Sequence, residues 1–162
     1  MVIRDNPDAN HFIEEFSKVY RYVLNNQEKE LVALRSELEF IRPYIFLLRK
    51  RFDEGLIIHI DIEEKFTHFL VIPIALQMLI ENAIKHNIVS SSKPLTVDIS
   101  VSVEQNSLVV SNNLQPRLPG ETSMKIGLKN IQQRYELISG RPVIVKKTDA
   151  VFEVTLPLLS LN

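Results

Sequence analysis

The sequence contains no cysteine, and charge of one sign does not dominate it. Without cysteine the chain forms neither disulfides nor thiolate metal sites, which fits a reducing compartment. Its 19 Lys and Arg side chains nearly balance 20 Asp and Glu side chains. The whole-chain charge therefore gives no basis for nucleic-acid binding or for binding to a membrane surface. Any anion site has to be local.

Long apolar runs are also missing. None approaches the roughly 18 to 20 residues that a bilayer span needs, and the first ten residues, MVIRDNPDAN, contain no signal-peptide core. We therefore expect a soluble piece of protein. What the chain does have is 45% apolar residues in a length of 162. This is enough for one domain with a buried core, with room for an additional helical arm.

The segment before Gly55 is helical in pattern. Apolar side chains recur at helical spacing from Phe12 to Val23 and again from Leu31 to Leu48. These patterns predict two helices, and Pro43 should kink the second because it removes a backbone donor and crowds the preceding turn. We expect residues 1–54 to form a helical arm and residues 55–162 to form a second, mixed domain.

After Gly55, strand and helix patterns alternate. The loop expected over residues 112–125 is rich in Pro, Gly, Ser and Asn, and Gly140 supplies a left-handed helix stop. This order predicts an α+β fold, a two-layer α/β sandwich in which the helices pack on one face of a mixed sheet. The predicted strands are 56–62, 95–103, 108–111, 142–147 and 151–157, and the predicted helices are 72–86 and 128–138.

The stretch IENAIKHN, residues 80–87, is unusually polar for the end of an apolar helix. On a helix, Glu81 and Lys85 share one face, while Asn82 lies on another. The side-chain carbonyl oxygen of Asn82 is a hard ligand suited to magnesium, and a lysine can neutralise the negative charge of a phosphate. The long polar loop that leads into Gly127 is a second place where backbone donors could meet phosphates.

The same stretch also fits an ordinary helix end. Lys85 and His86 would complement the helix dipole, and Asn87 would cap the last carbonyls. Short polar motifs match by chance often, so the spacing alone leaves both interpretations open.

Three groups of residues, in this order, resemble the LytS/YehU-type sensor histidine kinases. The resemblance implies the Bergerat ATP-binding fold of the GHKL superfamily, which also contains Hsp90-type chaperones, type II topoisomerases and MutL. In that family, helices like the first two form a dimerisation stalk. The three groups are Tyr20–Leu24 with Glu37–Ile41, Tyr44–Ile45 and Arg51–Phe52; Ile72–Pro73 with Leu76–Gln77 and Glu81–His86; and Ile126–Ile131 with Arg134–Tyr135.

The resemblance implies a Mg-ATP site. Asn82 would hold Mg2+ between the phosphates with Glu81 nearby, and Lys85 and His86 would face the phosphates or the ribose. Gly127 would let the backbone approach the phosphate tail. The other residues that the resemblance assigns to the nucleotide are Asn112, Asn113, Leu128, Lys129 and Asn130.

The chain departs from the family in its phosphoacceptor. The family's His-Phe-Leu-Phe-Asn motif is absent, and we expect the acceptor upstream of residue 1, so no catalytic residue is assigned within this chain. His11 and Phe12 imitate the start of the motif. His11 lies only about 2.5 helical turns before Tyr20, however, and we reject it as the acceptor.

Other departures concern the nucleotide itself. Asn112 stands where the family has the aspartate that reads adenine, and an uncharged acceptor makes a hydrogen bond about half as strong. Leu114 replaces a glycine, and Asp149 with Ala150 replaces a late Gly-Thr pair. Met78 stands where the ATP-hydrolysing members carry a glutamate base, which favours a kinase over an ATPase.

Two functions remain open. The first is the catalytic part of a two-component sensor histidine kinase that binds Mg-ATP and phosphorylates an upstream histidine, for relay to a DNA-binding response regulator. It would dimerise through its N-terminal helices, and it would be the cytoplasmic portion of a sensor anchored in the inner membrane by segments outside this chain. The second is a degenerate, non-catalytic GHKL module that works as a dimerisation or signalling adaptor.

Overall fold

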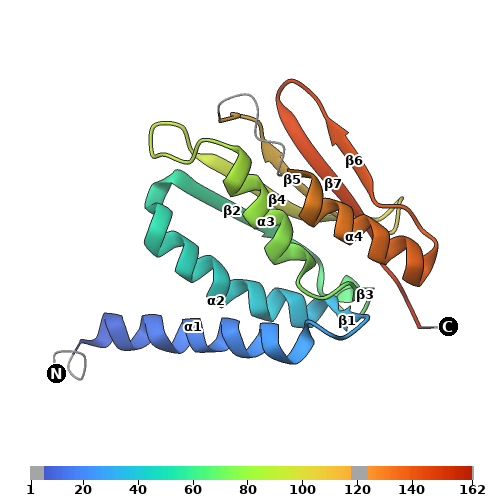
Figure 1. Cartoon of the computed structure of the whole chain (residues 1–162), viewed down its shortest axis with the longest axis horizontal. Helices are drawn as coiled ribbons and strands as arrows, with labels where there is room; N and C mark the ends of the chain where they lie inside the picture. Colours follow the sequence, from blue (N-terminus) through green and yellow to red (C-terminus); the bar gives the residue numbers. More distant parts are fainter. Residues whose placement is uncertain (1–5, 118–123, 162) are drawn as a thin grey trace.

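Five strands form one mixed sheet in the order β2-β4-β5-β7-β6 in the computed structural model, which describes residues 6–117 and 124–161 (Figure 1). β2 and β4 run parallel, and the other neighbours run antiparallel. The mixed sheet that the sequence predicts is therefore confirmed. The strands are β2 (Leu56–Asp61), β4 (Leu95–Ser102), β5 (Ser107–Asn113), β6 (Ile144–Lys147) and β7 (Val151–Pro157).

Helices α3 and α4 lie together on one face of this sheet (Figure 1). Helix α1 packs against α2, on the side of α2 that faces away from the sheet. This arrangement confirms the predicted α+β fold with its helices on one face. Two short strands, β1 (Val32–Ala33) and β3 (Leu70–Val71), pair with each other beside the start of α2. The helices are α1 (Pro7–Asn26), α2 (Leu34–Phe52), α3 (Ala75–His86) and α4 (Met124–Ser139), with single 3-10 turns η2 (Asp53–Gly55) and η3 (Glu64–Phe66).

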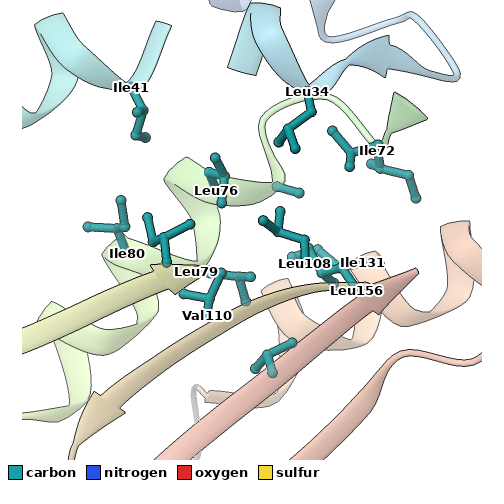
Figure 2. Close-up of a cluster of buried hydrophobic side chains, with 14 of the residues drawn as sticks. Leu34, Ile41, Ile72, Leu76, Leu79, Ile80, Leu108, Val110, Ile131 and Leu156 are labelled. Atoms are coloured by element: carbon teal, nitrogen blue, oxygen red, sulfur yellow. The ribbon is translucent and has the colours of Figure 1, made fainter. Parts of the chain in front are cut away.

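The core lies between the sheet and α3, and it extends to α2. Alternate side chains of β5 and β7 point inward, and Figure 2 shows Leu108 and Leu156 among the side chains of α3. Leu34 and Ile41 of α2 are fully buried in the same cluster. The second helix of the arm therefore shares its core with the sheet. The division of the chain near residue 54 stays a prediction.

Two helix starts differ from the sequence prediction. α3 begins at Ala75 instead of Ile72, because Ile74 has a left-handed backbone (φ 67°) and so cannot continue a helix. α4 begins at Met124, so Gly127 lies inside the helix and not before it. A glycine costs a helix only about 1 kcal/mol relative to alanine, which is too little to fix where the helix starts.

Other boundaries agree with the sequence or extend it. Gly140 ends α4 with φ 66°, as expected of a left-handed stop. β5 continues through Asn113, so Asn112 and Asn113 lie in a strand and not in the predicted loop, because pairing with β7 overrides the low strand propensity of asparagine. Residues 118–123 of the predicted loop lie outside the described residues. α2 runs as one helix through Pro43, and the kink there stays a prediction.

Candidate functional site

A cavity of about 160 Å3 lies between α3 and α4. It brings together residues that are far apart in the sequence, since α3 supplies Glu81, Asn82 and Lys85 and the first turns of α4 supply Gly127 and Leu128. These five are half of the residues that the resemblance assigned to the nucleotide. Met78, Leu79 and Ile131 complete the lining, and the sequence had given no reason to place Leu79 and Ile131 there.

A second, smaller cavity of about 40 Å3 lies between the end of α3 and the end of β5. Asn82 lines the cavity between α3 and α4 and also this smaller one. Its other lining residues are Ala83, His86, Asn87, Asn112, Leu114, Pro116, Lys147 and Phe152.

Asn82 is half-buried, and none of the described residues hydrogen-bonds its side-chain amide. Its oxygen is a hard donor of the kind that Mg2+ prefers. Lys85 is exposed at the edge of the same cavity, one helical turn from Glu81. This edge of the cavity therefore offers one neutral oxygen and one cationic side chain to a ligand.

The Glu81 carboxylate is already engaged by the protein. Its Oε1 accepts hydrogen bonds from the Tyr44 hydroxyl and from Gln77 Nε2, both at 3.0 Å. Burial, and then the negative charge of Glu81, raise the pKa of Tyr44 above its ordinary value, so this hydroxyl keeps its proton and donates. Glu81 is thus held beside the cavity by α2, although the sequence had placed it only near the metal.

The two asparagines at the end of β5 have different roles. Asn112 is buried against the smaller cavity, and its Nδ2 donates to the Asn113 carbonyl at 2.8 Å. Asn113 lies outside both cavities, because its side chain accepts from the Thr96 N–H at 2.8 Å and donates to the Pro94 carbonyl at 3.2 Å. Asn113 therefore joins β5 to the start of β4.

Asn87 closes the C-terminal end of α3. Its Nδ2 donates to the Ala83 carbonyl at 2.9 Å, as the helix-end interpretation of the motif expects. Its Oδ1 accepts from the Gln115 N–H at 2.8 Å, which ties the segment after β5 to the helix. Because Asn87 and Asn82 both line the smaller cavity, the polar stretch both ends a helix and forms a cavity wall.

Lys129 and Asn130 are exposed on α4 and lie outside both cavities, so their assignment to the nucleotide stays a prediction. Sequence reasoning also missed Lys147, which reaches the smaller cavity because β6 pairs in register with β7 opposite Phe152. In the described ranges, no group of three His, Asp or Glu side chains could hold a metal ion.

The chain is similar to known proteins in both of its parts. The family model described as "Histidine kinase" matches residues 1–56. The sensor histidine kinase/phosphatase LytS of Staphylococcus aureus (strain MRSA252) is 29% identical over 156 residues, covering 86% of this chain. The sensor protein LytS of Staphylococcus epidermidis (strain ATCC 12228) is 29% identical over 107 residues, covering 66% of this chain and 18% of that protein. These matches support a LytS-type sensor histidine kinase.

The chain spans about a quarter (27%) of the length of the S. aureus LytS that it matches. Within the ranges that the structure describes, no helix is long and apolar enough to cross a membrane.

Solved histidine kinases share the fold of this chain. The cytoplasmic segment of the histidine kinase QseC matches with a TM-score of 0.53 at 13% identity, covering 99% of both chains. Acinetobacter baumannii AdeS matches with a TM-score of 0.54 at 15% identity, covering 93% of this chain and 78% of that one. The nucleotide-free catalytic domain of ThkA matches at 0.51 and 18% identity, covering 80% and 96%. At these identities the likeness establishes the fold alone.

Proposed function

We propose that the chain is the ATP-binding part of a two-component sensor histidine kinase. In this proposal the cavity between α3 and α4 receives the phosphates of Mg-ATP, and the smaller cavity beside Asn112 opens to receive adenine. The observation that carries the proposal is the meeting of Asn82 and Lys85 with Gly127 in one cavity, together with a second cavity at the end of β5 that Asn82 also lines.

The residues present fit a magnesium ion that arrives with the nucleotide. Mg2+ keeps several waters and is usually bound through one or two protein oxygens together with substrate phosphates. Asn82 offers one such oxygen, which makes no hydrogen bond with the described residues. The bound ion would neutralise charge on the phosphates. Lys85 would balance the remaining phosphate charge, and Gly127 would leave room for the phosphates because it has no side chain.

The phosphoryl group would pass to a histidine outside this chain and from there to an aspartate of a response regulator. Two side chains of the cavity bear on hydrolysis. The Met78 thioether cannot take a proton from water, and the Glu81 carboxylate already accepts hydrogen bonds from Tyr44 and Gln77. The chemistry of the cavity thus supports transfer to a protein side chain in preference to hydrolysis. In this proposal the chain is the cytoplasmic portion of a membrane-anchored sensor.

A homodimer formed through α1 is part of the proposal. One face of α1 carries large apolar side chains that no other described element covers. Exposed apolar faces of this kind on an amphipathic helix are typical of helix-helix association. The side chains are Phe12, Ile13, Phe16, Tyr20 and Leu24, which are 41% to 59% exposed.

The alternative, a non-catalytic GHKL module, is favoured by the adenine side of the site. There Asn112 donates its amide to the neighbouring carbonyl of Asn113, and the cavity holds only about 40 Å3. A module of this kind would bind nucleotide weakly or not at all, and would act through its helices alone.

Calorimetric titration with a non-hydrolysable ATP analogue and Mg2+ separates the two functions. We expect the wild type to bind and Asn82→Ala to lose binding, with Asn10→Ala, an exposed asparagine on α1, as the matched control. If Asn82 acts through the metal, the difference between wild type and Asn82→Ala disappears when EDTA replaces Mg2+. No binding by the wild type at millimolar nucleotide would instead establish the non-catalytic module.

A further inference from the structure

Two polar contacts, one near each end of the shared face, join α2 to α3. The Glu37 carboxylate of α2 accepts hydrogen bonds from the Ile74 N–H at 2.6 Å and the Leu76 N–H at 3.3 Å. Further along, the Tyr44 hydroxyl of α2 donates to the Glu81 carboxylate of α3 at 3.0 Å. Seven residues are about two helical turns, so Glu37 and Tyr44 lie on the same face of α2. The two helices therefore meet in a fixed register.

At the first contact, Glu37 acts as the cap that α3 lacks. The residue before the helix is Ile74, which has a left-handed backbone (φ 67°) and offers no side-chain cap. The first N–H groups of any helix need partners from elsewhere, and a negative charge is favourable there. Glu37 is fully buried and supplies two acceptor oxygens to these N–H groups from another helix. Its carboxylate also holds Ile74 in a conformation that a β-branched residue rarely adopts.

The same carboxylate reaches α1. The Tyr22 hydroxyl donates to Glu37 Oε1 at 2.8 Å, and the Tyr22 ring stacks on Phe40 of α2, with 4.2 Å between ring centroids. Three helices thus meet at one buried group. A displacement of α1 that withdraws Tyr22 would leave Glu37 with one donor fewer at the start of α3.

At the second contact, Tyr44 acts beside the candidate site. Glu81 lines the cavity between α3 and α4 next to Asn82, and it also lines a further cavity of about 390 Å3 that Tyr44 shares. Tyr44 is 7% exposed and stands in the core with Ile41 and Ile45 of α2. A buried hydroxyl on α2 therefore fixes the residue adjacent to the proposed metal ligand.

We propose that Glu37 and Tyr44 are positioning residues that set the placement of α3 against α2, and with it the placement of Asn82 in the cavity. The link to nucleotide binding rests on the function proposed above, whereas the placement of α3 does not. Neither residue lines the cavity between α3 and α4, so both would act on a ligand there only through α3.

The test uses two variants and one control. Tyr44→Phe removes a single hydroxyl, and Glu37→Gln keeps the shape of the side chain while replacing one acceptor oxygen with an amide donor. Glu104→Gln, at an exposed glutamate in the turn between β4 and β5, is the matched control. We expect amide hydrogen exchange in residues 75–82 to rise about fivefold or more in both variants without nucleotide, which corresponds to the loss of roughly one net hydrogen bond. Exchange in β4 and β5 should stay at the wild-type level.

A double-mutant cycle separates positioning from general stability. If Tyr44 acts through Glu81, then Tyr44→Phe has no further effect on exchange in α3 when Glu81 is already alanine. Affinity for Mg2+ with a non-hydrolysable ATP analogue should fall about fivefold in Tyr44→Phe and stay unchanged in Glu104→Gln. Should Glu37→Gln fail to fold, the exchange and the cycle of Tyr44→Phe decide the question.

Wild-type exchange in α3 for both variants would overturn the proposal. So would a rise that is equal in α3, β4 and β5, because that result means a loss of overall stability alone. If the wild type binds no nucleotide, the proposed function fails, and the exchange data by themselves decide whether Glu37 and Tyr44 place α3.

Discussion

The Asn87 side chain accepts a hydrogen bond from the Gln115 N–H on its Oδ1 at 2.8 Å, and its Nδ2 donates to the Ala83 carbonyl at 2.9 Å. One buried side chain, 2% exposed, thus connects the last turn of α3 to the segment that follows β5. We expect Asn87→Ala to lower the free energy of unfolding by about 1 to 3 kcal/mol, because it leaves buried polar groups without partners. Urea denaturation measures this, with Asn10→Ala as the control. A loss equal to that of the control would contradict the assigned role.

Gly127, inside α4, and Gly140, directly after its last residue, allow a matched comparison. A Cβ on Gly127 would lie 3.5 Å from Met78 Cε, an ordinary contact, whereas Gly140 has a left-handed backbone (φ 66°). We expect Gly127→Ala to keep or raise stability by up to about 1 kcal/mol, because alanine favours a helix. Gly140→Ala should lose about 1 to 2 kcal/mol. Thermal unfolding of both variants checks these signs.

Of these two variants, the more stable one, Gly127→Ala, should have the lower nucleotide affinity. The methyl group of Gly127→Ala enters the cavity between α3 and α4, so binding of the ATP analogue should weaken, while Gly140 lies outside that lining. Unchanged affinity in Gly127→Ala would mean that the phosphates do not approach this turn of the helix.

Much of this architecture could be predicted from the sequence because it is encoded by local periodicity. The alternation over residues 95–103 and 108–111 predicts two strands, and in the structure they pair as an antiparallel hairpin with φ 46° at Asn106 in its turn. The polar stretch at the end of α3 could likewise be recognised from the sequence as a cavity wall, since Asn82 and Lys85 line the same cavity. Local signals of this kind need no partner from elsewhere in the chain.

The rest depends on partners that are distant in the sequence. Glu37 caps α3 across 37 and 39 positions, and no helix propensity identifies that pair. Asn113 was assigned to the nucleotide, yet its amide is used by the backbone of Thr96 and Pro94, because β5 pairs with β4 in this register. Boundaries set by such contacts are beyond the reach of a single sequence.

The stability of the fold should depend on pH through Glu37. Burial raises the pKa of this carboxyl above its ordinary 4.5, although the hydrogen bonds from Ile74, Tyr22 and Leu76 partly oppose the rise. A raised folded-state pKa means that the contribution of Glu37 to stability is fully present below about pH 4.5 and is lost as the pH rises through the folded-state value.

Because Glu37→Gln does not titrate, the difference in unfolding free energy, wild type minus variant, should fall as the pH rises from 4 to 8. Urea denaturation of both proteins at a series of pH values measures that difference. The other carboxylates are the same in both proteins, so their effects on the unfolding free energy cancel. A difference that is constant over this range would show that Glu37 has the same pKa in the folded and unfolded chains.

The exposed apolar face of α1 predicts self-association. Phe16 is 54% exposed in the middle of that face, and a charge there should prevent a second copy from covering it, because a buried unpaired charge is costly. We expect sedimentation of the wild type to report a dimer and that of Phe16→Asp a monomer. Leu137→Asp, at an 85% exposed leucine on α4, is the matched control and should remain dimeric. A monomeric wild type at high concentration, or a dimer that survives in Phe16→Asp, would remove α1 as the dimer interface.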